Sequence, residues 1–251
     1  MLFDALPRDN DRITPGIVHL PNWLSLQNQA GIVRQLRDIA RTLIGTPFQM
    51  SRPQLKSGQM QVFMLHLGRY WATDPYRYVT DVGGHRVPPI PANLVSLAST
   101  ALKDASLYDE TLAPWATSFR PDMALVNYYP PGATMGLHQD LNEDSPAPIV
   151  SLSIGDEALF RIGGTENRNK PWDDVTLASG DVIVFGGPKR LAFHGVPQTR
   201  PGTLPEALRE SCGLEKGRLN ITFRQVELSV AYLWLPGRLY ARRIEYPASR
   251  D

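Results

Sequence analysis

Three residues from two distant segments have the types expected of a metal site. His138 and Asp140 are separated by a single residue, and His194 follows much later in the chain. Side chains two positions apart on an extended segment point the same way, so His138 and Asp140 can bind one ion together. Two imidazoles and one carboxylate on one face of a metal leave its other positions open, as in non-haem iron(II) oxygenases. The short motif alone is weak, and the alternative is a surface histidine beside a solvated carboxylate.

A second pattern lies in the segment 218–224. Arg218 and Arg224 are an even number of residues apart, so on a strand they share one face with Asn220 and Thr222. Such a face is a poor apolar core, whereas a buried guanidinium can pair with a carboxylate through two parallel hydrogen bonds. The strand therefore predicts a dicarboxylate site. The alternative is a solvent-exposed face whose arginines are hydrated.

Two helices are predicted in the first half of the chain. Ser25 is a suitable N-cap for a helix that ends before Gly45. The apolar residues at helical spacing in this segment are Val33, Leu36, Ala40, Leu43 and Ile44. A second helix is expected from Pro91 to about Ser106, since proline in a first turn loses no hydrogen bond. Residues 13–20 are interpreted as one strand, and residues 60–78 as one strand followed by a surface loop.

From about residue 120 onward, short apolar runs alternate with glycine- and proline-rich turns. The predicted strands are Ala124–Tyr129, Ile149–Ile154, Ala158–Ile162, Val182–Phe185, Leu191–His194 and Leu219–Phe223. Many short strands at such intervals are typical of a double-sheet jelly roll. Because helices come first and strands second, the predicted class is α+β. We expect a jelly-roll (double-stranded β-helix) core with the N-terminal helices packed on one sheet.

The composition limits the classes of protein to which this chain can belong. Hydrophobic residues make up 42% of the 251 residues, which allows a sizeable core, and the net charge of +1 gives no global basic field. Nucleic-acid binding would therefore depend on a local patch. The single cysteine, Cys212, excludes an internal disulfide and a thiolate-rich metal site. With no leader-like or membrane-length apolar run, we expect a cytoplasmic monomer without a membrane partner.

An ordered series of motifs resembles the AlkB family of iron(II)/2-oxoglutarate-dependent dioxygenases, which repair alkylated nucleic acids. Asn127, Tyr129 and Gly132 match its Asn-x-Tyr-x-x-Gly segment, and His138 and Asp140 match its His-x-Asp. Further similar segments, in family order, are 147–155, 160–164, 180–187, 190–195 and 218–225. Each motif is moderately specific, but the ordered set from about 120 to 225 is a strong signal. Weaker similarity extends back to about residue 13.

The resemblance implies a cofactor set and an activity. Iron(II) would be held by His138, Asp140 and His194. These three residues and Arg224 would be the catalytic residues. The co-substrate 2-oxoglutarate would lie against Asn127, Tyr129, Arg218, Asn220 and Arg224. With O2, such an enzyme oxidatively dealkylates N-alkylated bases in DNA, with RNA as an alternative substrate, and releases succinate, CO2 and an aldehyde. The protein fixes the geometry while metal and co-substrate carry the chemistry.

The same resemblance places a nucleotide-recognition loop ahead of the barrel. A base-repair enzyme takes single strands or extrudes the base and stacks it on aromatic rings. The candidates here are Tyr70, Trp71, Tyr76 and Tyr78, with the local alignment leaving Tyr70 or Trp71 open as the stacking residue. Asn142 stands where the founding bacterial pattern of the family has an acidic residue that reads the base edge. The family's basic residue that contacts the substrate falls at Asn167 or Arg168. The alternative is that these aromatics are ordinary core residues.

The predicted oxygenase domain covers residues 1–225. Its helices and recognition loop occupy about 13–110, its catalytic core about 120–225, and residues 226–251 form an extension of unknown role. Two other functions share these features. One is a 2-oxoglutarate oxygenase acting on a protein or small metabolite, which would lack turnover on methylated oligonucleotides. The other is a cupin-like binding module, which would not bind 2-oxoglutarate.

Overall fold

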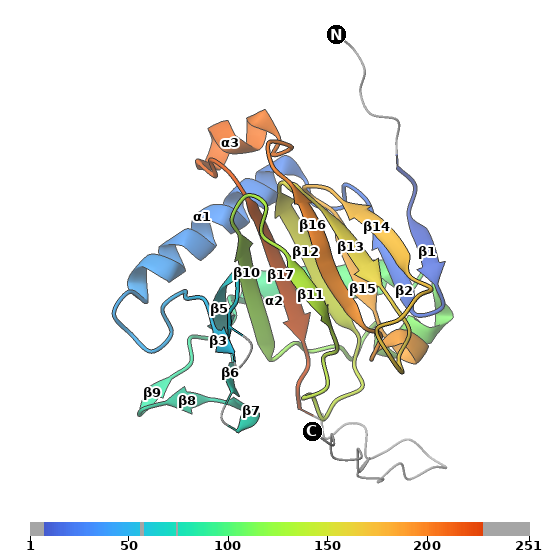
Figure 1. Cartoon of the computed structure of the whole chain (residues 1–251), viewed down its shortest axis with the longest axis horizontal. Helices are drawn as coiled ribbons and strands as arrows, with labels where there is room; N and C mark the ends of the chain where they lie inside the picture. Colours follow the sequence, from blue (N-terminus) through green and yellow to red (C-terminus); the bar gives the residue numbers. More distant parts are fainter. Residues whose placement is uncertain (1–7, 56–57, 74, 228–251) are drawn as a thin grey trace.

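The arginine-bearing segment forms β17 (Arg218–Arg224), an inner strand of the larger of two facing β-sheets. The computed structural model describes residues 8–55, 58–73 and 75–227. Within them the larger sheet is antiparallel, in the order β1-β2-β15-β12-β17-β10-β5 (Figure 1). Its other strands are β1 (Asp11–Thr14), β2 (Ile17–Leu20), β15 (Val182–Phe185), β12 (Ile149–Gly155), β10 (Met123–Tyr129) and β5 (Phe63–Leu67). In this register Asn127 lies opposite Asn220, and Tyr129 lies opposite Arg218.

The smaller sheet is also antiparallel, in the order β11-β16-β13-β14. Its strands are β11 (Met135–His138), β16 (His194–Arg200), β13 (Glu157–Ile162) and β14 (Asp173–Leu177). His138 pairs with His194 in this register, although the two come from distant segments. The inner faces of both sheets share an apolar cluster that includes Phe160, Ile183 and Phe185. The predicted α+β class with a jelly-roll core is therefore confirmed.

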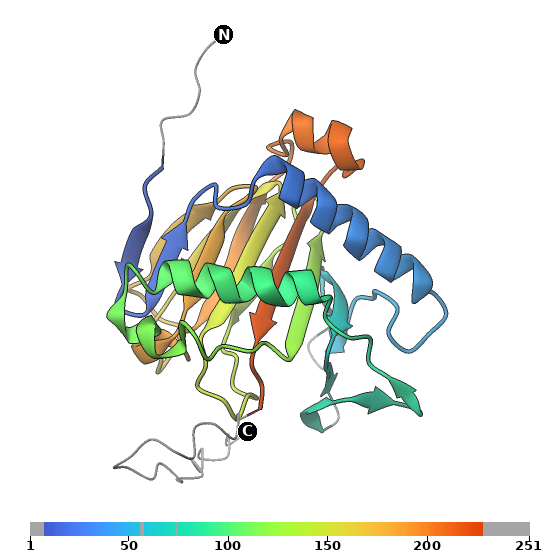
Figure 2. The same cartoon turned by 180° about the vertical axis from the view of Figure 1, so that it is seen from behind.

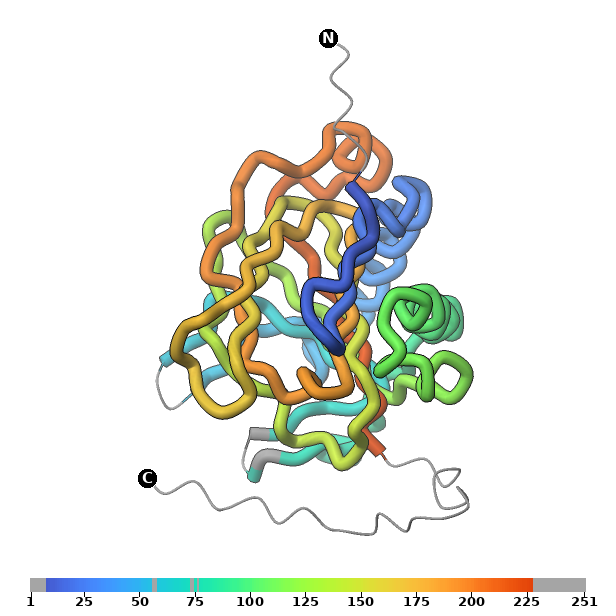
Figure 3. Tube along the Cα trace, turned by 90° about the vertical axis from the view of Figure 1, so that its right-hand side faces the viewer, coloured from blue at the N-terminus to red at the C-terminus, as the bar shows by residue number. Residues whose placement is uncertain are grey.

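Helices cover the outer face of the larger sheet (Figures 2 and 3). They are α1 (Leu26–Thr42) and α2 (Ala92–Ala105), and the short α3 (Glu206–Cys212) packs against α1. As expected, the Ser25 hydroxyl caps α1 by accepting a hydrogen bond from the Asn28 N–H at 3.2 Å. Ile221 and Phe223 of β17 join the helices in one buried cluster. Because strand side chains alternate, Arg218, Asn220, Thr222 and Arg224 then face the smaller sheet.

Three short hairpins lie beside the β5 edge of the larger sheet (Figure 1). They are β3 (Gln54–Leu55) with β4 (Gly58–Gln59), β6 (Tyr70–Thr73) with β7 (Tyr76–Val79), and β8 (Asp81–Val82) with β9 (His85–Arg86). The turn into β6 requires a glycine, since Gly68 has φ +77° and an added Cβ would lie 2.1 Å from the Asp122 carbonyl oxygen. Two 3-10 turns, η1 (Glu110–Trp115) and η2 (Gly187–Lys189), complete the elements.

Several element predictions were wrong. Residues 13–20 contain a turn rather than one strand, because Gly16 adopts φ +92° and lets the chain reverse between β1 and β2. The expected loop after β5 is the β6–β7 hairpin. The predicted strand Leu191–His194 is mostly turn that follows η2, and β16 begins only at His194. Ile44 is 73% exposed because α1 has already ended.

The smaller sheet held two strands that the sequence did not indicate. β11 is short and mixed in polarity, and β14 begins with two aspartates, so neither showed an apolar alternation. In the described part of the chain, no helix has both the length and the apolar character to cross a bilayer. Residues 228–251, the bulk of the predicted extension, lie outside the described residues.

Candidate active site between the two sheets

The inner faces of the two sheets enclose a cavity of about 840 Å³. Its lining includes twelve of the residues singled out from the sequence, from both sheets, the β6–β7 hairpin and the loops between strands. They are Trp71, Tyr78, Asn127, Tyr129, His138, Asp140, Asn142, Arg168, His194, Arg218, Asn220 and Arg224. One cavity therefore collects both the metal motif and the polar face of β17.

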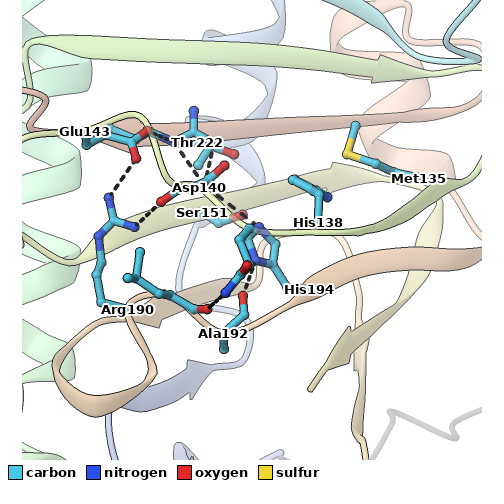
Figure 4. Close-up of polar contacts among 12 residues, drawn as sticks. Met135, His138, Asp140, Glu143, Ser151, Arg190, Ala192, His194 and Thr222 are labelled. Carbon is cyan, nitrogen blue, oxygen red and sulfur yellow. Dashed lines mark hydrogen bonds and ion pairs between the residues drawn. The ribbon is translucent and has the colours of Figure 1, made fainter. Parts of the chain in front are cut away.

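The His138, Asp140 and His194 side chains converge at the end of the smaller sheet (Figure 4). Each offers one ligand atom, and the three atoms lie within 4.8 Å of one another. The imidazole rings are 4.5 Å apart between centroids, and His194 Nε2 lies 3.8 Å from an Asp140 carboxylate oxygen. The β11–β16 pairing brings the two histidines together across the sheet. This separation suits three ligands around a single ion.

Backbone carbonyls select the ring nitrogen that each histidine presents. His138 Nδ1 lies 3.0 Å from the Gly136 carbonyl oxygen, and His194 Nδ1 lies 2.9 Å from that of Ala192. A carbonyl can only accept, so in both rings Nδ1 carries the hydrogen and donates it. Nε2 is then left with a lone pair. Such outer hydrogen bonds fix the tautomer of metal-binding histidines.

The charges of the ligands suit a divalent cation. Burial opposes ionisation of Asp140, but Arg224, His194 and His138 outweigh it and hold the pKa of this carboxyl well below its usual range. Burial, followed by the nearby His138, lowers the pKa of His194 to about 4. At neutral pH the site therefore combines an ionised carboxylate with a neutral His194.

Arg218 is a buried cation whose donors are mostly unused. Its side chain is buried, and Nη2 donates to the Ser153 hydroxyl at 2.9 Å, while Nε and Nη1 have no hydrogen-bond partner among the described residues. Burial lowers the pKa of this guanidinium. Within the part of the chain that the structure describes, the buried Asn127 Oδ1 also lacks a partner, whereas Asn127 Nδ2 donates to Asn220 Oδ1 at 3.3 Å. Buried polar groups are almost always paired, so these orphan atoms mark a place built for a polar ligand.

Arg224, which the resemblance places against 2-oxoglutarate, already has carboxylate partners within the protein. Its Nε and Nη2 donate to Asp140 Oδ2 at 3.1 and 2.8 Å, and it lies 3.4 Å from Glu143. Arg224 thus holds the carboxylate of a candidate metal ligand in place. Asn220 is also occupied, since its amide group contacts Ser151, Leu152, Asn127 and Thr222.

Glu143 and Arg190 belong to the site, and sequence reasoning missed them both. The Glu143 side chain is only 1% exposed and accepts a hydrogen bond from the Tyr78 hydroxyl at 2.7 Å. Arg190 donates to Glu143 at 3.2 Å and to the carbonyls of Asp140 and Ala147 (Figure 4). A single glutamate in a loop gives no periodic pattern, so only its closeness to Asp140 in sequence could have drawn attention to it.

The β6–β7 hairpin brings aromatic side chains to the cavity. Trp71 and Tyr78 line it, whereas Tyr70 is not among the lining residues and packs against Phe48 and His66. Alternation along β6 explains this, because neighbouring residues point to opposite faces. The side chain of the further candidate Tyr76 lies outside the described part of the structure.

The mouth of the cavity carries the remaining candidates. Asn142 and Arg168 are exposed and line the cavity, and the Arg168 guanidinium lies 5.6 Å from the Phe193 ring centre. Of the two basic-contact candidates, Arg168 and not Asn167 is a lining residue. These positions place polar side chains where a ligand enters.

The residues fit ferrous iron and a dicarboxylate. His138, Asp140 and His194 provide the two-histidine, one-carboxylate donor set that ferrous oxygenases use. The unpartnered donors of Arg218 and the unpartnered oxygen of Asn127 offer polar contacts on the same cavity wall. A carboxylate matches the planar fork of a guanidinium. The arrangement can therefore hold both groups side by side.

Comparison with known proteins gives the family. Residues 16–224 match the model of the 2OG-Fe(II) oxygenase superfamily. The AlkB homolog of Caulobacter vibrioides, an alpha-ketoglutarate-dependent dioxygenase, is 38% identical over 85% of this chain and 89% of its own. ALKBH1C of Arabidopsis thaliana, a DNA N(6)-methyladenine demethylase, is 36% identical over 85% of this chain, which spans about half the length of that relative. The solved structure of OsALKBH1 superimposes with a TM-score of 0.74 at 32% identity, over 86% of this chain and all of the other. The chain belongs to the AlkB family of 2OG-Fe(II) oxygenases.

Proposed function

We propose that this protein oxidatively dealkylates N-alkylated bases in DNA, using O2 and 2-oxoglutarate. The observation that carries the proposal is one cavity that joins the His138–Asp140–His194 cluster to the aromatic side chains of Trp71 and Tyr78. Relatives named as AlkB dioxygenases and DNA demethylases support the same activity. The substrate would be single-stranded DNA or a base extruded from a duplex, with RNA as a further candidate, and the enzyme would act as a cytoplasmic monomer.

Each part of the cavity has a task in this reaction. Iron(II), when bound with 2-oxoglutarate and O2, supplies the oxidising power that hydroxylates the alkyl carbon, after which the base is restored and an aldehyde leaves. Asp140 and the two histidines hold the metal, and Arg224 fixes the orientation of the Asp140 carboxylate. Arg218 offers its unused N–H groups to one carboxylate of the co-substrate. Closing these charges away from water strengthens every contact among them.

The substrate half of the cavity favours a flat, polar-edged ligand. Trp71 provides a ring on which a base can stack, and stacking of this kind contributes about 1–3 kcal/mol per base. Asn142 at the mouth offers both a donor and an acceptor to a base edge. Arg168 supplies a positive charge at the entrance, which suits a phosphate.

The decisive experiment is a panel of oligonucleotides that each carry one modified base, in single-stranded and annealed form. With iron(II), O2 and 2-oxoglutarate, we expect loss of the alkyl mass by mass spectrometry and release of formaldehyde from methyl lesions. The control is Asp140→Ala, which lacks a metal ligand. Methylated peptides and free amino acids form the second arm. Turnover confined to that arm would replace the repair function with hydroxylation of a protein or metabolite.

A further inference from the structure

Leu141 is an apolar side chain held at the entrance of the cavity. It is 47% exposed, although large hydrophobic residues in the described chain are rarely so, and it lines the cavity. The other large hydrophobics with comparable exposure do not line it; they are Leu26, Ile44, Leu107 and Tyr108. The feature therefore belongs to the site rather than to the general surface.

The rest of the entrance is polar or lacks side chains. The exposed residues among those that line the cavity are Gly58, Gln59, Gln61, Gly136, Leu141, Asn142 and Arg168. In this set of described residues, Leu141 has the one large apolar side chain. A hydrocarbon surface at a polar entrance is unfavourable in water unless a ligand covers it.

The backbone on both sides of Leu141 is firmly anchored. The preceding Asp140 is bound by Arg224 through its carboxylate and by Arg190 through its carbonyl oxygen. Gln139 before it donates to the carbonyls of Thr165 and Leu191 at 2.8 and 2.7 Å. Two residues later, the buried Glu143 is held by Tyr78 and Arg190.

These contacts restrict the positions that the Leu141 side chain can adopt. A leucine on a loose loop could fold back and hide its side chain, but here the flanking contacts keep the backbone in one place. The exposed hydrocarbon is thus preorganised next to the metal ligands. Preorganised groups lose less entropy when they bind.

We infer that Leu141 is a wedge that fills the gap left in a DNA duplex when the target base turns into the cavity. This inference rests on the proposed function and specifies the substrate further. The enzyme would accept a damaged base in duplex DNA as well as in a single strand. An extruded base leaves its neighbours without a stacking partner, and apolar side chains such as leucine insert at such steps. Leu141 is adjacent to the base cavity and is continuous with its lining, so it can occupy that gap while the base is bound.

The test compares one probe in two forms: a 15-mer with a single 3-methylcytosine, single-stranded or annealed to its complement. We expect Leu141→Ala to lower kcat/KM on the duplex by about tenfold, equivalent to about 1.4 kcal/mol, and to change the single-strand value by less than about twofold. Leu141→Met, which keeps an apolar side chain of similar size, should restore most of the duplex activity. Leu107→Ala, an 80% exposed leucine away from the cavity, is the matched control and should change neither value.

A second readout does not depend on turnover. Fluorescence anisotropy with the metal-free full chain should show that Leu141→Ala weakens binding of the duplex and leaves binding of the single strand unchanged. Equal losses on both forms, or a lower melting temperature, would overturn the inference and indicate that Leu141 packs against residues 228–251 or a second copy. A wild-type enzyme that processes the single strand and ignores the duplex would also overturn it. Absence of turnover on every modified oligonucleotide would instead refute the proposed function.

Discussion

Arg218 and Arg224 lie on the same strand, yet their replacement should change stability in opposite directions. In the described residues, Arg218 has two nitrogens without a hydrogen-bond partner and no carboxylate within ion-pair distance, whereas Arg224 is bound to Asp140 and lies beside Glu143. Burial lowers the pKa of Arg218, while the two acids outweigh burial and raise the pKa of Arg224. The first guanidinium is a buried charge with only weak compensation, from the Ser153 hydroxyl and the Tyr129 ring 5.1 Å away, whereas the second is paired with carboxylates.

The magnitudes follow from this contrast. Replacing a buried ion pair by hydrophobic side chains of similar volume can stabilise a protein by about 1–4 kcal/mol, and a buried cation without a carboxylate partner recovers still less of its burial cost. We expect Arg218→Met to raise the free energy of unfolding of the ligand-free protein by about 2 kcal/mol, and the melting temperature by about 4–8 °C. Arg224→Met removes the guanidinium from the buried Asp140 carboxylate, at a cost of about 3–5 kcal/mol, whereas Glu143 keeps Arg190 and Tyr78.

The assay is thermal unfolding of the wild type and both variants, first with a chelator and then with Mn(II) and saturating 2-oxoglutarate. A ligand at a hundred times its Kd should stabilise the wild type by about 2.7 kcal/mol. Arg218→Met should show little of this gain, because the carboxylate loses its partner. A destabilised Arg218→Met protein without ligand, or one with a full 2-oxoglutarate gain, would refute the view that Arg218 is kept for the diacid.

Three further predictions concern the metal, pH and the hairpin. Asp140→Ala should reduce iron(II) affinity more than a hundredfold, since it removes a charged ligand, as followed by anaerobic titration. Burial and then Arg224 lower the pKa of His66 to about 4, so between pH 6.5 and 4 the unfolded chain binds a proton that the folded chain does not. As pH drops through this range, His66 should therefore lower the free energy of unfolding of the metal-free protein by up to about 1.4 kcal/mol per pH unit. Melting temperatures measured across the range will test this. Glu143→Gln and Tyr78→Phe should each raise KM for the oligonucleotide about tenfold, because each weakens a buried charge-assisted hydrogen bond. KM for 2-oxoglutarate, measured in the same kinetic assays, should not change.

Each of these has a control. Turnover of Asp140→Ala at the wild-type rate would remove it from the ligand set. His66→Gln should reduce the pH slope without abolishing it, because burial also lowers the pKa of His194 to about 4 and adds a loss of the same sign. An unchanged slope would assign the loss of stability to other groups. Glu157→Gln breaks an exposed ion pair with Arg200 far from the cavity lining and should leave KM alone. Additive effects of Glu143→Gln and Tyr78→Phe in the double variant would show that the two side chains do not act together.

The sequence predicted the parts of the site that depend on strand periodicity. His138 and Asp140 at spacing two, and Arg218 to Arg224 at spacing six, converge because alternation fixes which face each side chain occupies. The helices were predictable for a similar reason, since the Ser25 cap and the apolar spacing are local signals.

The remaining features depend on contacts between distant segments. Arg224 was indistinguishable from Arg218 in sequence, and only the fold shows that Asp140 occupies its donors. Glu143 and Arg190 meet across 47 residues of chain, and no periodic pattern reports such a pair. The β16 strand was misplaced because the turn after η2 contains apolar residues that mimic a strand.

The β6–β7 hairpin forms a two-stranded sheet of its own, outside both layers of the jelly roll. It supplies Trp71 and Tyr78 to the cavity, while the candidate metal ligands and the polar face of β17 come from strands and loops of the two layers. Under the proposed function, changes in hairpin length or sequence would therefore alter which lesions are accepted without disturbing the groups proposed to carry the oxidation. In evolutionary terms, substrate range and chemistry can diversify separately in this architecture, and exchanging residues 70–79 between relatives is a direct way to transfer lesion preference.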